Sequence, residues 1–288
     1  MRAVRQFIIL FASWLGCWVQ APVAAFQGDT RPYYTAASIV NAATNTAGPF
    51  APNTIITIYG THLAFDTIAV SAQTIASHTL PTELGGVHVV IDGLPAGLYY
   101  VSPGQINLLI PNSLLPGVSR ITVARDGVSG PCPDGAPEPC PPCPDDESVQ
   151  CPSVPITLGE VAPGLFADRN LLIAATHANG AIVSAADPVT AGEWVVLYCV
   201  GLGRTAPDLY NGEVAVRAMP AVHWADLSVL VGGSAITGWR IYYAGVTPGY
   251  AGLYQINVKL PDDMAPNPEV RFAIGARLSP PSTYLVTR

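Results

Sequence analysis

The chain has 288 residues, half of them hydrophobic and only 11% charged, which is enough for two domains that each bury a core. The formal net charge is −7, and Lys259 is the single lysine. An acidic, lysine-poor surface repels phosphate backbones and anionic lipid surfaces, so composition argues against nucleic acid as a partner.

The first 25 residues have the form of a secretory signal peptide. Two arginines begin the segment, residues 7–19 are apolar but short for a bilayer span, and small residues at 23–25 suit cleavage before Phe26. A lipoprotein signal with Cys17 as the acylated residue is the alternative, although Trp14 stands where an aliphatic residue is expected. We therefore expect a secreted or cell-surface protein, with the periplasm as another exported location and no membrane insertion after cleavage.

Short β-branched and aromatic runs separated by turn residues follow the leader and predict an all-β protein. The Asp92-Gly93 and Asp126-Gly127 pairs are typical hairpin signals. In the first half we expect strands near residues 36–43, 54–59, 87–91, 98–101, 105–110 and 120–125.

The same order of runs recurs in the second half, at residues 193–198, 227–231, 242–243 and 255–257. The offset between the copies grows from 139 to 150 residues across turns, as loop insertions would make it. One insertion is visible after Thr247-Pro248-Gly249, because Ser102-Pro103-Gly104 runs directly into its Gln-Ile-Asn strand.

The repeat predicts two tandem immunoglobulin-like β-sandwich domains. We expect a signal peptide at residues 1–25, a first domain at 26–159 with a cysteine-rich insert at 131–152, and a second domain at 160–288. The short apolar joint near residues 159–166 indicates packed domains.

The repeated Gln-Ile-Asn strand combines an apolar core face with a polar face. The amides either bond a loop near the Ser-Pro-Gly bend, which we favour, or form a polar binding strip beside tyrosines. The amides are Gln105, Asn107, Gln255 and Asn257, and the tyrosines are Tyr99, Tyr100, Tyr242 and Tyr243.

Four of the six cysteines lie in the insert, at Cys132, Cys140, Cys143 and Cys151. Their mirror-symmetric spacing suits a hairpin tip with nested pairs, Cys132 with Cys151 and Cys140 with Cys143, although the three connectivities stay open. Zinc would need two close pairs where one exists, and no βαβ pattern surrounds the Cys-x-x-Cys. In an exported chain we favour a disulfide-stapled hairpin.

Other chemistry-bearing patterns are weak. Cys199 lies in an apolar run and we expect it to be buried. Trp194, Trp224 and Trp239 could form a sugar-stacking platform, although aromatic residues in strands more often pack in a core. No catalytic motif, metal-ligand spacing or cofactor loop is present.

One ordered series of short motifs resembles the uncharacterised C-terminal domain family first defined in Solibacter proteins. The series comprises residues 40–43, 56–63, 80–81, 84–87, 100–107, 162–166, 201–203 and 252–257. Residues 57–63 also resemble the opening of IPT/TIG immunoglobulin-like domains. The resemblance implies secreted bacterial proteins in which this region often follows other extracellular modules. It carries no established activity, so it transfers no functional residue.

We predict an exported, non-enzymatic β-sandwich protein with a binding or structural role outside the cell. Its expected partner is an extracellular protein or polysaccharide, and no cofactor is expected. The alternatives are a carbohydrate-binding module with exposed Tyr or Trp side chains and a secreted enzyme whose site has no recognisable motif.

Overall fold

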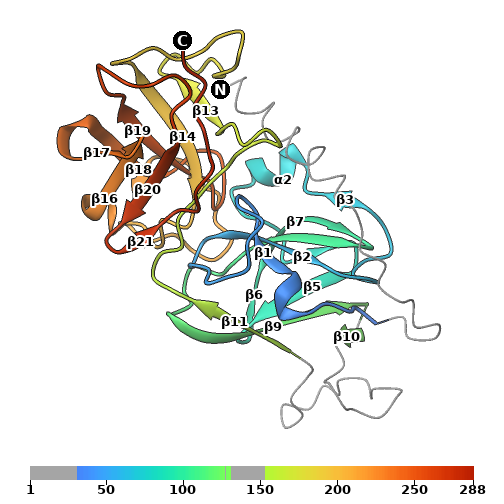
Figure 1. The fold of residues 1–288 in the computed structure, drawn as a ribbon. Coiled ribbons are helices and arrows are strands. Elements are labelled where there is room, and N and C mark those ends of the chain that lie inside the picture. Colours follow the sequence, from blue (N-terminus) through green and yellow to red (C-terminus); the bar gives the residue numbers. More distant parts are fainter. Residues whose placement is uncertain (1–30, 127, 131–152) are drawn as a thin grey trace.

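The computed structural model describes residues 31–126, 128–130 and 153–288. These residues form antiparallel sheets arranged as two immunoglobulin-like β-sandwiches, one after the other along the chain (Figure 1). The prediction of an all-β fold with tandem immunoglobulin-like sandwiches is confirmed.

The first sandwich packs a sheet of order β1-β2-β8-β7-β3 against a sheet built on β9 and β5. The strands of the first sheet are β1 (Ile39–Asn41), β2 (Ile55–Tyr59), β8 (Gln105–Leu109), β7 (Gly97–Ser102) and β3 (Ile68–Ala69). Those of the second are β4 (Glu83–Leu84), β5 (Val87–Ile91), β6 (Leu94–Pro95), β9 (Gly117–Arg125), β10 (Val128–Gly130) and β11 (Val154–Leu158). Two short helices, η1 (Ala36–Ser38) and α2 (Ala72–Ala76), lie in the connections.

The second sandwich has the same plan, with a sheet of order β12-β14-β19-β18-β15 facing one of order β17-β16-β20-β21. The first of these contains β12 (Gly164–Leu165), β13 (Ala175–His177), β14 (Trp194–Val200), β15 (Met219–Pro220), β18 (Ile241–Val246) and β19 (Tyr254–Lys259). The second contains β16 (Leu227–Val231), β17 (Ser234–Ile236), β20 (Val270–Ile274) and β21 (Arg277–Leu278). The 3-10 helices η2 (Trp224–Asp226) and η3 (Gly238–Arg240) precede β16 and β18.

The strand register is repeated between the two sandwiches. Asn107 of β8 pairs with Thr57 of β2, and Asn257 of β19 pairs with Val196 of β14. The register with the next strand shifts between Leu98 and Tyr100 in the first sandwich and between Ile241 and Tyr243 in the second. The irregularity therefore falls on the same position of both copies, occupied by Tyr99 and by Tyr242.

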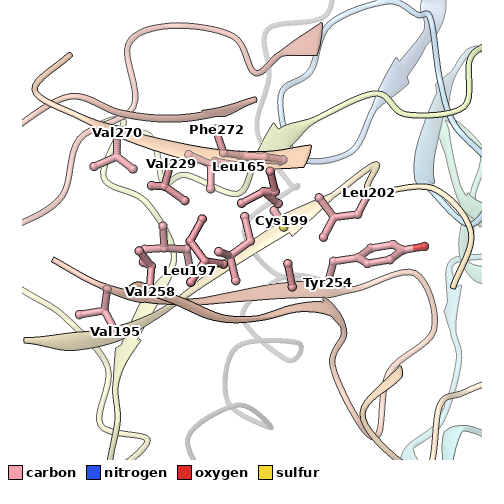
Figure 2. Packing of buried hydrophobic residues seen from close by; sticks show 14 of the residues in the cluster. Leu165, Val195, Leu197, Cys199, Leu202, Val229, Tyr254, Val258, Val270 and Phe272 are labelled. Atoms are coloured by element: carbon pink, nitrogen blue, oxygen red, sulfur yellow. The ribbon is translucent and has the colours of Figure 1, made fainter. Parts of the chain in front are cut away.

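Alternate residues of the facing sheets fill each core, as the two-residue period of a strand requires. Figure 2 shows Leu197 and Val258 of one sheet of the second sandwich opposite Val229 and Phe272 of the other. Cys199 lies in the same cluster with no exposed surface, and burial raises the pKa of its thiol. The expectation that Cys199 is a buried small side chain is confirmed.

The two sandwiches are joined by the loop between β18 and β19 of the second. This loop contains the insertion after Gly249, and Ala251 within it packs against Leu80, Leu109 and Val214. The Tyr99 hydroxyl donates to the Ala251 carbonyl at 2.6 Å and accepts from the Ala251 amide at 3.1 Å. The insertion is thus one of two parts of the second copy that the first sandwich receives. The other is the loop before β15, where the Leu80 amide donates to the Gly212 carbonyl and the Val214 amide donates to the His78 carbonyl, both at 2.9 Å.

Polar groups complete the joint around this apolar contact. The Tyr254 hydroxyl accepts from the Asn53 amide at 2.9 Å and donates to the Gly203 carbonyl. The Asn112 amide donates to Asp208 at 2.6 Å and to the Leu209 carbonyl at 2.8 Å. The contacts of Asn53 and Asn112 join residues 96 to 201 positions apart, so the sandwiches are packed together rather than strung on a linker.

The insert leaves the sandwich from an edge strand. Gly130 of β10 pairs with Val123, and Val154 of β11 pairs with Ile121, so the strands flanking residues 131–153 run along the same side of β9. The expectation that the insert extends a hairpin tip is wrong, because its flanking strands both pair with β9 instead of with each other. The Tyr34 hydroxyl fills the break, accepting from the Val123 amide at 2.9 Å and lying 3.2 Å from the Ile121 and Gly130 carbonyls.

Candidate functional site

The amides of the repeated strand bond to each other within each sandwich. The Gln105 side chain donates to the Asn107 side chain at 2.8 Å, and Gln255 donates to Asn257 at the same distance. The partner is therefore the neighbouring amide on the same strand face, and no loop takes this role among the described residues. Asn107 also accepts from the Thr57 hydroxyl at 3.1 Å, which buries the amide pair of the first copy more fully.

The four tyrosines named from the sequence have different surroundings. Tyr99 packs into the joint, where burial raises the pKa of its phenol. Tyr100 is half-buried on β7. The Tyr243 hydroxyl lies 2.9 Å from the Met219 carbonyl and 2.8 Å from the Val246 carbonyl, and burial raises its pKa to about 12. Tyr242, by contrast, is 77% exposed.

A group of aromatic and basic side chains lies around Tyr242, which we call the Trp239 face. It consists of Trp194, Trp239, Tyr242 and Lys259, from β14, η3, β18 and β19. The Trp194 and Tyr242 rings meet edge to face, with centroids 6.4 Å apart and planes at 82°. The Lys259 ammonium lies 5.5 Å from the centroid of the Trp239 ring, which is 70% exposed. Trp239 and Tyr242 therefore expose large aromatic surfaces at this end of the sheet, whereas Trp194 is half-buried between them and the strands.

Arg240 holds the turn that carries Trp239. Its guanidinium donates to the Leu260 carbonyl at 2.9 Å and to Asp262 at 2.8 Å. The hydrogen bond and the charge of Arg240 lower the pKa of the Asp262 carboxyl. Lys259 makes no ion pair with any residue that the structure describes, although its charge also lowers the pKa of the Asp262 carboxyl. The Arg240 guanidinium lies 5.2 Å from the centroid of the Trp239 ring, so two cations adjoin this ring.

The Trp239 face lies at positions of the second sandwich that are equivalent to the joint positions of the first. Trp194 pairs with Lys259 as Ile55 pairs with Leu109, and Tyr242 stands at the irregularity where the first copy has Tyr99. In the first copy these positions receive the second sandwich, and Leu109 is 1% exposed. The second copy thus has tryptophan and lysine where the first has isoleucine and leucine, and nothing within the described residues covers them as Ala251 covers the first copy.

A titratable cluster lies directly beside Trp194. The His177 ring bonds through Nδ1 to the Glu193 carboxylate, and its Nε2 is 3.5 Å from Asp187. Burial lowers the pKa of His177, but the hydrogen bonds and charges of Glu193 and Asp187 outweigh it and raise that pKa. Burial likewise raises the pKa of Glu193, while bonds from His177 and Thr190 outweigh this and lower it. The cluster is a charged pair that fixes the start of β14.

The other residues named from the sequence do not join this face. Trp224 lies in η2 and is 40% exposed, with no ring contact to Trp194 or Trp239. The insert cysteines Cys132, Cys140, Cys143 and Cys151 lie outside the described residues. Within the described ranges, no group of three or more His, Cys, Asp or Glu side chains could hold a metal, and no helix is long and apolar enough to span a bilayer.

The grouping of Trp194 with Tyr242 and Lys259 was missed from the sequence. The signal that could have found it is the repeat itself, which aligns Trp194 and Lys259 with the apolar Ile55 and Leu109. A tryptophan and the chain's single lysine in place of two core-type residues indicates a change of environment.

Comparison with solved structures finds remote likenesses. The surface glycan-binding protein SGBP-B of the Bacteroides ovatus mixed-linkage glucan utilization locus is 10% identical, with a TM-score of 0.28 over 77% of this chain and 36% of its own. PbSGBP-B of Prevotella bryantii is 11% identical, with a TM-score of 0.24 over 87% of this chain and 41% of its own. Domains 5–6 of the S-layer protein SbsC are 10% identical, with a TM-score of 0.26 over 89% of this chain and 99% of theirs.

The chain spans less than half the length of the two glycan-binding proteins, and all three scores are too low to carry an argument about function. No curated protein matches the sequence. The comparison with family models identifies an IPT/TIG domain at residues 38–135, which begins just before β1 and ends within the insert.

Proposed function

We propose that the chain is an exported, non-enzymatic module that presents one end of its second sandwich to a partner outside the cell. The signal peptide is placed at residues 1–25, with cleavage before Phe26, and the domains at residues 26–159 and 160–288. The motif series that resembles the Solibacter-defined family supports export. The proposed location is secreted or attached to the cell surface.

The observation that carries this proposal is the joint between the sandwiches. Buried and part-buried hydrogen bonds of Tyr99, Asn112 and Tyr254 and the apolar contact of Ala251 connect the two copies across one interface. Such a joint limits relative motion of the copies, because opening it would expose both the apolar surface and the unpaired polar groups. The protein is therefore suited to hold the Trp239 face at a fixed position relative to the first sandwich.

Export and envelope binding test the proposal together. The full chain is expressed in a bacterial host, the exported product is sequenced from its N-terminus, and the purified product is incubated with cell envelopes. We expect a product that starts at Phe26 and sediments with the envelopes. Retention of the uncleaved chain in the cytoplasm, or failure to bind any envelope fraction, would contradict the proposed function.

A carbohydrate-binding role is the second candidate, and the exposed rings of Trp239 and Tyr242 favour it over a purely structural role. Tyr242 contacts Trp194 and Trp239 contacts Lys259, so the two exposed rings belong to a cluster of side chains rather than standing singly on the surface. The face is also amphipathic, since Lys259 adjoins the rings.

A further inference from the structure

We propose that the Trp239 face binds a polysaccharide chain of pyranose sugars, with sugar rings stacked on Trp239 and Tyr242 and hydroxyl groups bonded by Lys259 and Asn257. This inference rests on the proposed function as an extracellular binding module and names the ligand class of that module.

The two copies are equivalent at this end of the sheet. The positions of Ile55, Leu109 and Tyr99 form a docking surface in the first sandwich, so the geometry of this sheet end accepts a partner. The second copy keeps the tyrosine as Tyr242 but replaces the two aliphatic residues by Trp194 and Lys259. The partner of the second copy therefore differs in chemistry from the dry apolar loop that fills the first.

The side chains of the Trp239 face match the chemistry of a sugar ring. A pyranose has an apolar C–H face that packs on aromatic rings and a rim of hydroxyl groups that need hydrogen-bond partners. Trp239 and Tyr242 are 70% and 77% exposed and supply the aromatic surface. A protein loop of the kind that fills the first joint would bury the Lys259 ammonium without a partner, which is costly.

A line of polar groups lies beside the rings. Gln255, Asn257 and Lys259 alternate with core residues along β19, so all three face the same side as Trp194. Gln255 donates to the Asn257 side-chain oxygen, which leaves the Asn257 amide nitrogen and the Gln255 side-chain oxygen without partners among the described residues. A donor, an acceptor and an ammonium thus lie in a row at the spacing of a strand.

Hydrogen bonds and ion pairs hold the Trp239 face in place before any ligand binds. Arg240 bonds η3 to the Leu260 carbonyl and to Asp262. Glu193, the residue before Trp194, pairs with His177. Side chains on rigid elements lose less conformational entropy on binding, which favours affinity.

The test is affinity electrophoresis of the whole mature chain through gels that contain one of three polysaccharides. These are a neutral β-glucan, polygalacturonate and a bacterial exopolysaccharide. We expect at least one polysaccharide to retard the protein, and Trp239→Ala and Tyr242→Ala each to weaken that binding about tenfold or more. Tyr210→Ala is the matched control, since Tyr210 is an 83% exposed tyrosine near the joint, and it should bind as wild type. Thermal unfolding of each variant checks that the fold is kept.

The choice of polysaccharides distinguishes a ligand that carries carboxylates from a neutral one. Lys259→Gln should reduce binding of polygalacturonate more than that of the neutral glucan if the ligand carries carboxylates. Migration unaffected by all three polysaccharides, or equal binding by Trp239→Ala, Tyr242→Ala and wild type, would overturn the proposal.

Envelope treatment distinguishes this inference from the proposed function. Periodate cleaves sugar diols and should abolish envelope binding, whereas protease treatment should leave it. If protease removes the binding and periodate does not, the partner is a protein; the sugar proposal then fails while the binding module stands.

Discussion

The two sandwiches share one strand register but differ in what covers the end of the sheet that contains the Gln-Ile-Asn strand. In the first, Ile55, Leu109 and Tyr99 receive the loop that carries Ala251. In the second, the corresponding Trp194 and Lys259 are half-buried and Tyr242 is exposed to solvent. A repeat can thus keep its backbone pairing while the side chains at one end of a sheet decide whether that end packs within the fold or faces outward.

Exchanging the aliphatic and basic residues between the copies should give the largest difference in the free energy of unfolding. Leu109→Lys places an ammonium in a buried apolar cluster and should lower the free energy of unfolding by about 3–5 kcal/mol. Lys259→Leu, the reciprocal change, should alter it by no more than about 0.5 kcal/mol, because the lysine is partly exposed and unpaired in the described structure. Urea unfolding of both variants measures the difference, and similar losses would show that the two positions are not in different environments.

A methyl group in the loop between β18 and β19 tests the joint itself. An added Cβ at Gly252 would lie 2.2 Å from the Leu109 side chain and 3.0 Å from the Asn53 carbonyl oxygen, whereas one at Gly249 would meet nothing within 4 Å. Both glycines have positive φ, so the two alanine variants carry a similar backbone cost. We expect Gly252→Ala to lose about 1–3 kcal/mol more than Gly249→Ala in denaturant unfolding. Equal losses would contradict a tightly packed joint.

Removal of one hydroxyl tests how the edge strand around the insert is held. Tyr34→Phe leaves the buried Val123 amide without its acceptor and should cost about 1–2 kcal/mol. In the second sandwich the Ser279 hydroxyl accepts from the corresponding Phe272 amide at 3.1 Å, so Ser279→Ala should have a similar effect there. Tyr33→Phe, at an exposed neighbouring tyrosine, is the control and should leave the thermal midpoint unchanged.

The smallest expected effect concerns pH. The raised pKa of His177 gives stability that is complete below its ordinary value of 6.5 and is lost as pH rises through the folded-state pKa. The lowered pKa of Glu193 gives stability that is complete above 4.5 and is lost as pH falls through its folded-state pKa. His177→Gln should therefore lose up to about 1 kcal/mol relative to wild type between these values and less at pH 9. A difference in midpoint that does not vary with pH would contradict the pairing.

The strands that carry strong β-branched patterns could be predicted from the sequence. Residues 54–59, 87–91 and 105–110 were expected as strands, and β2, β5 and β8 lie within them. The repeat was visible because its Gln-Ile-Asn strand recurs with the same neighbours, and the structure confirms the shared register. Short edge strands such as β12 and β21 have only two residues, which is too few to show a period.

The joint and the Trp239 face could not be read from local pattern. Tyr99 and Ala251 are 152 positions apart, and their contact depends on how two complete sandwiches pack. The amides of the repeated strand illustrate the same limit. The side-chain oxygens of Asn107 and Asn257 each accept from the glutamine two positions earlier on the same strand, where the sequence predicts a loop as partner. Which of four similar tyrosines is exposed follows from tertiary packing alone.

The broken edge strand beside β9 has a consequence for protein engineering. Gly130 and Val154 are fixed to Val123 and Ile121, two residues apart on β9, whatever chain lies between them. The entropy of closing a loop grows only with the logarithm of its length, so doubling the intervening segment costs about 0.6 kcal/mol. This position is therefore a natural graft point at which peptides of different length could be displayed without disturbing either core.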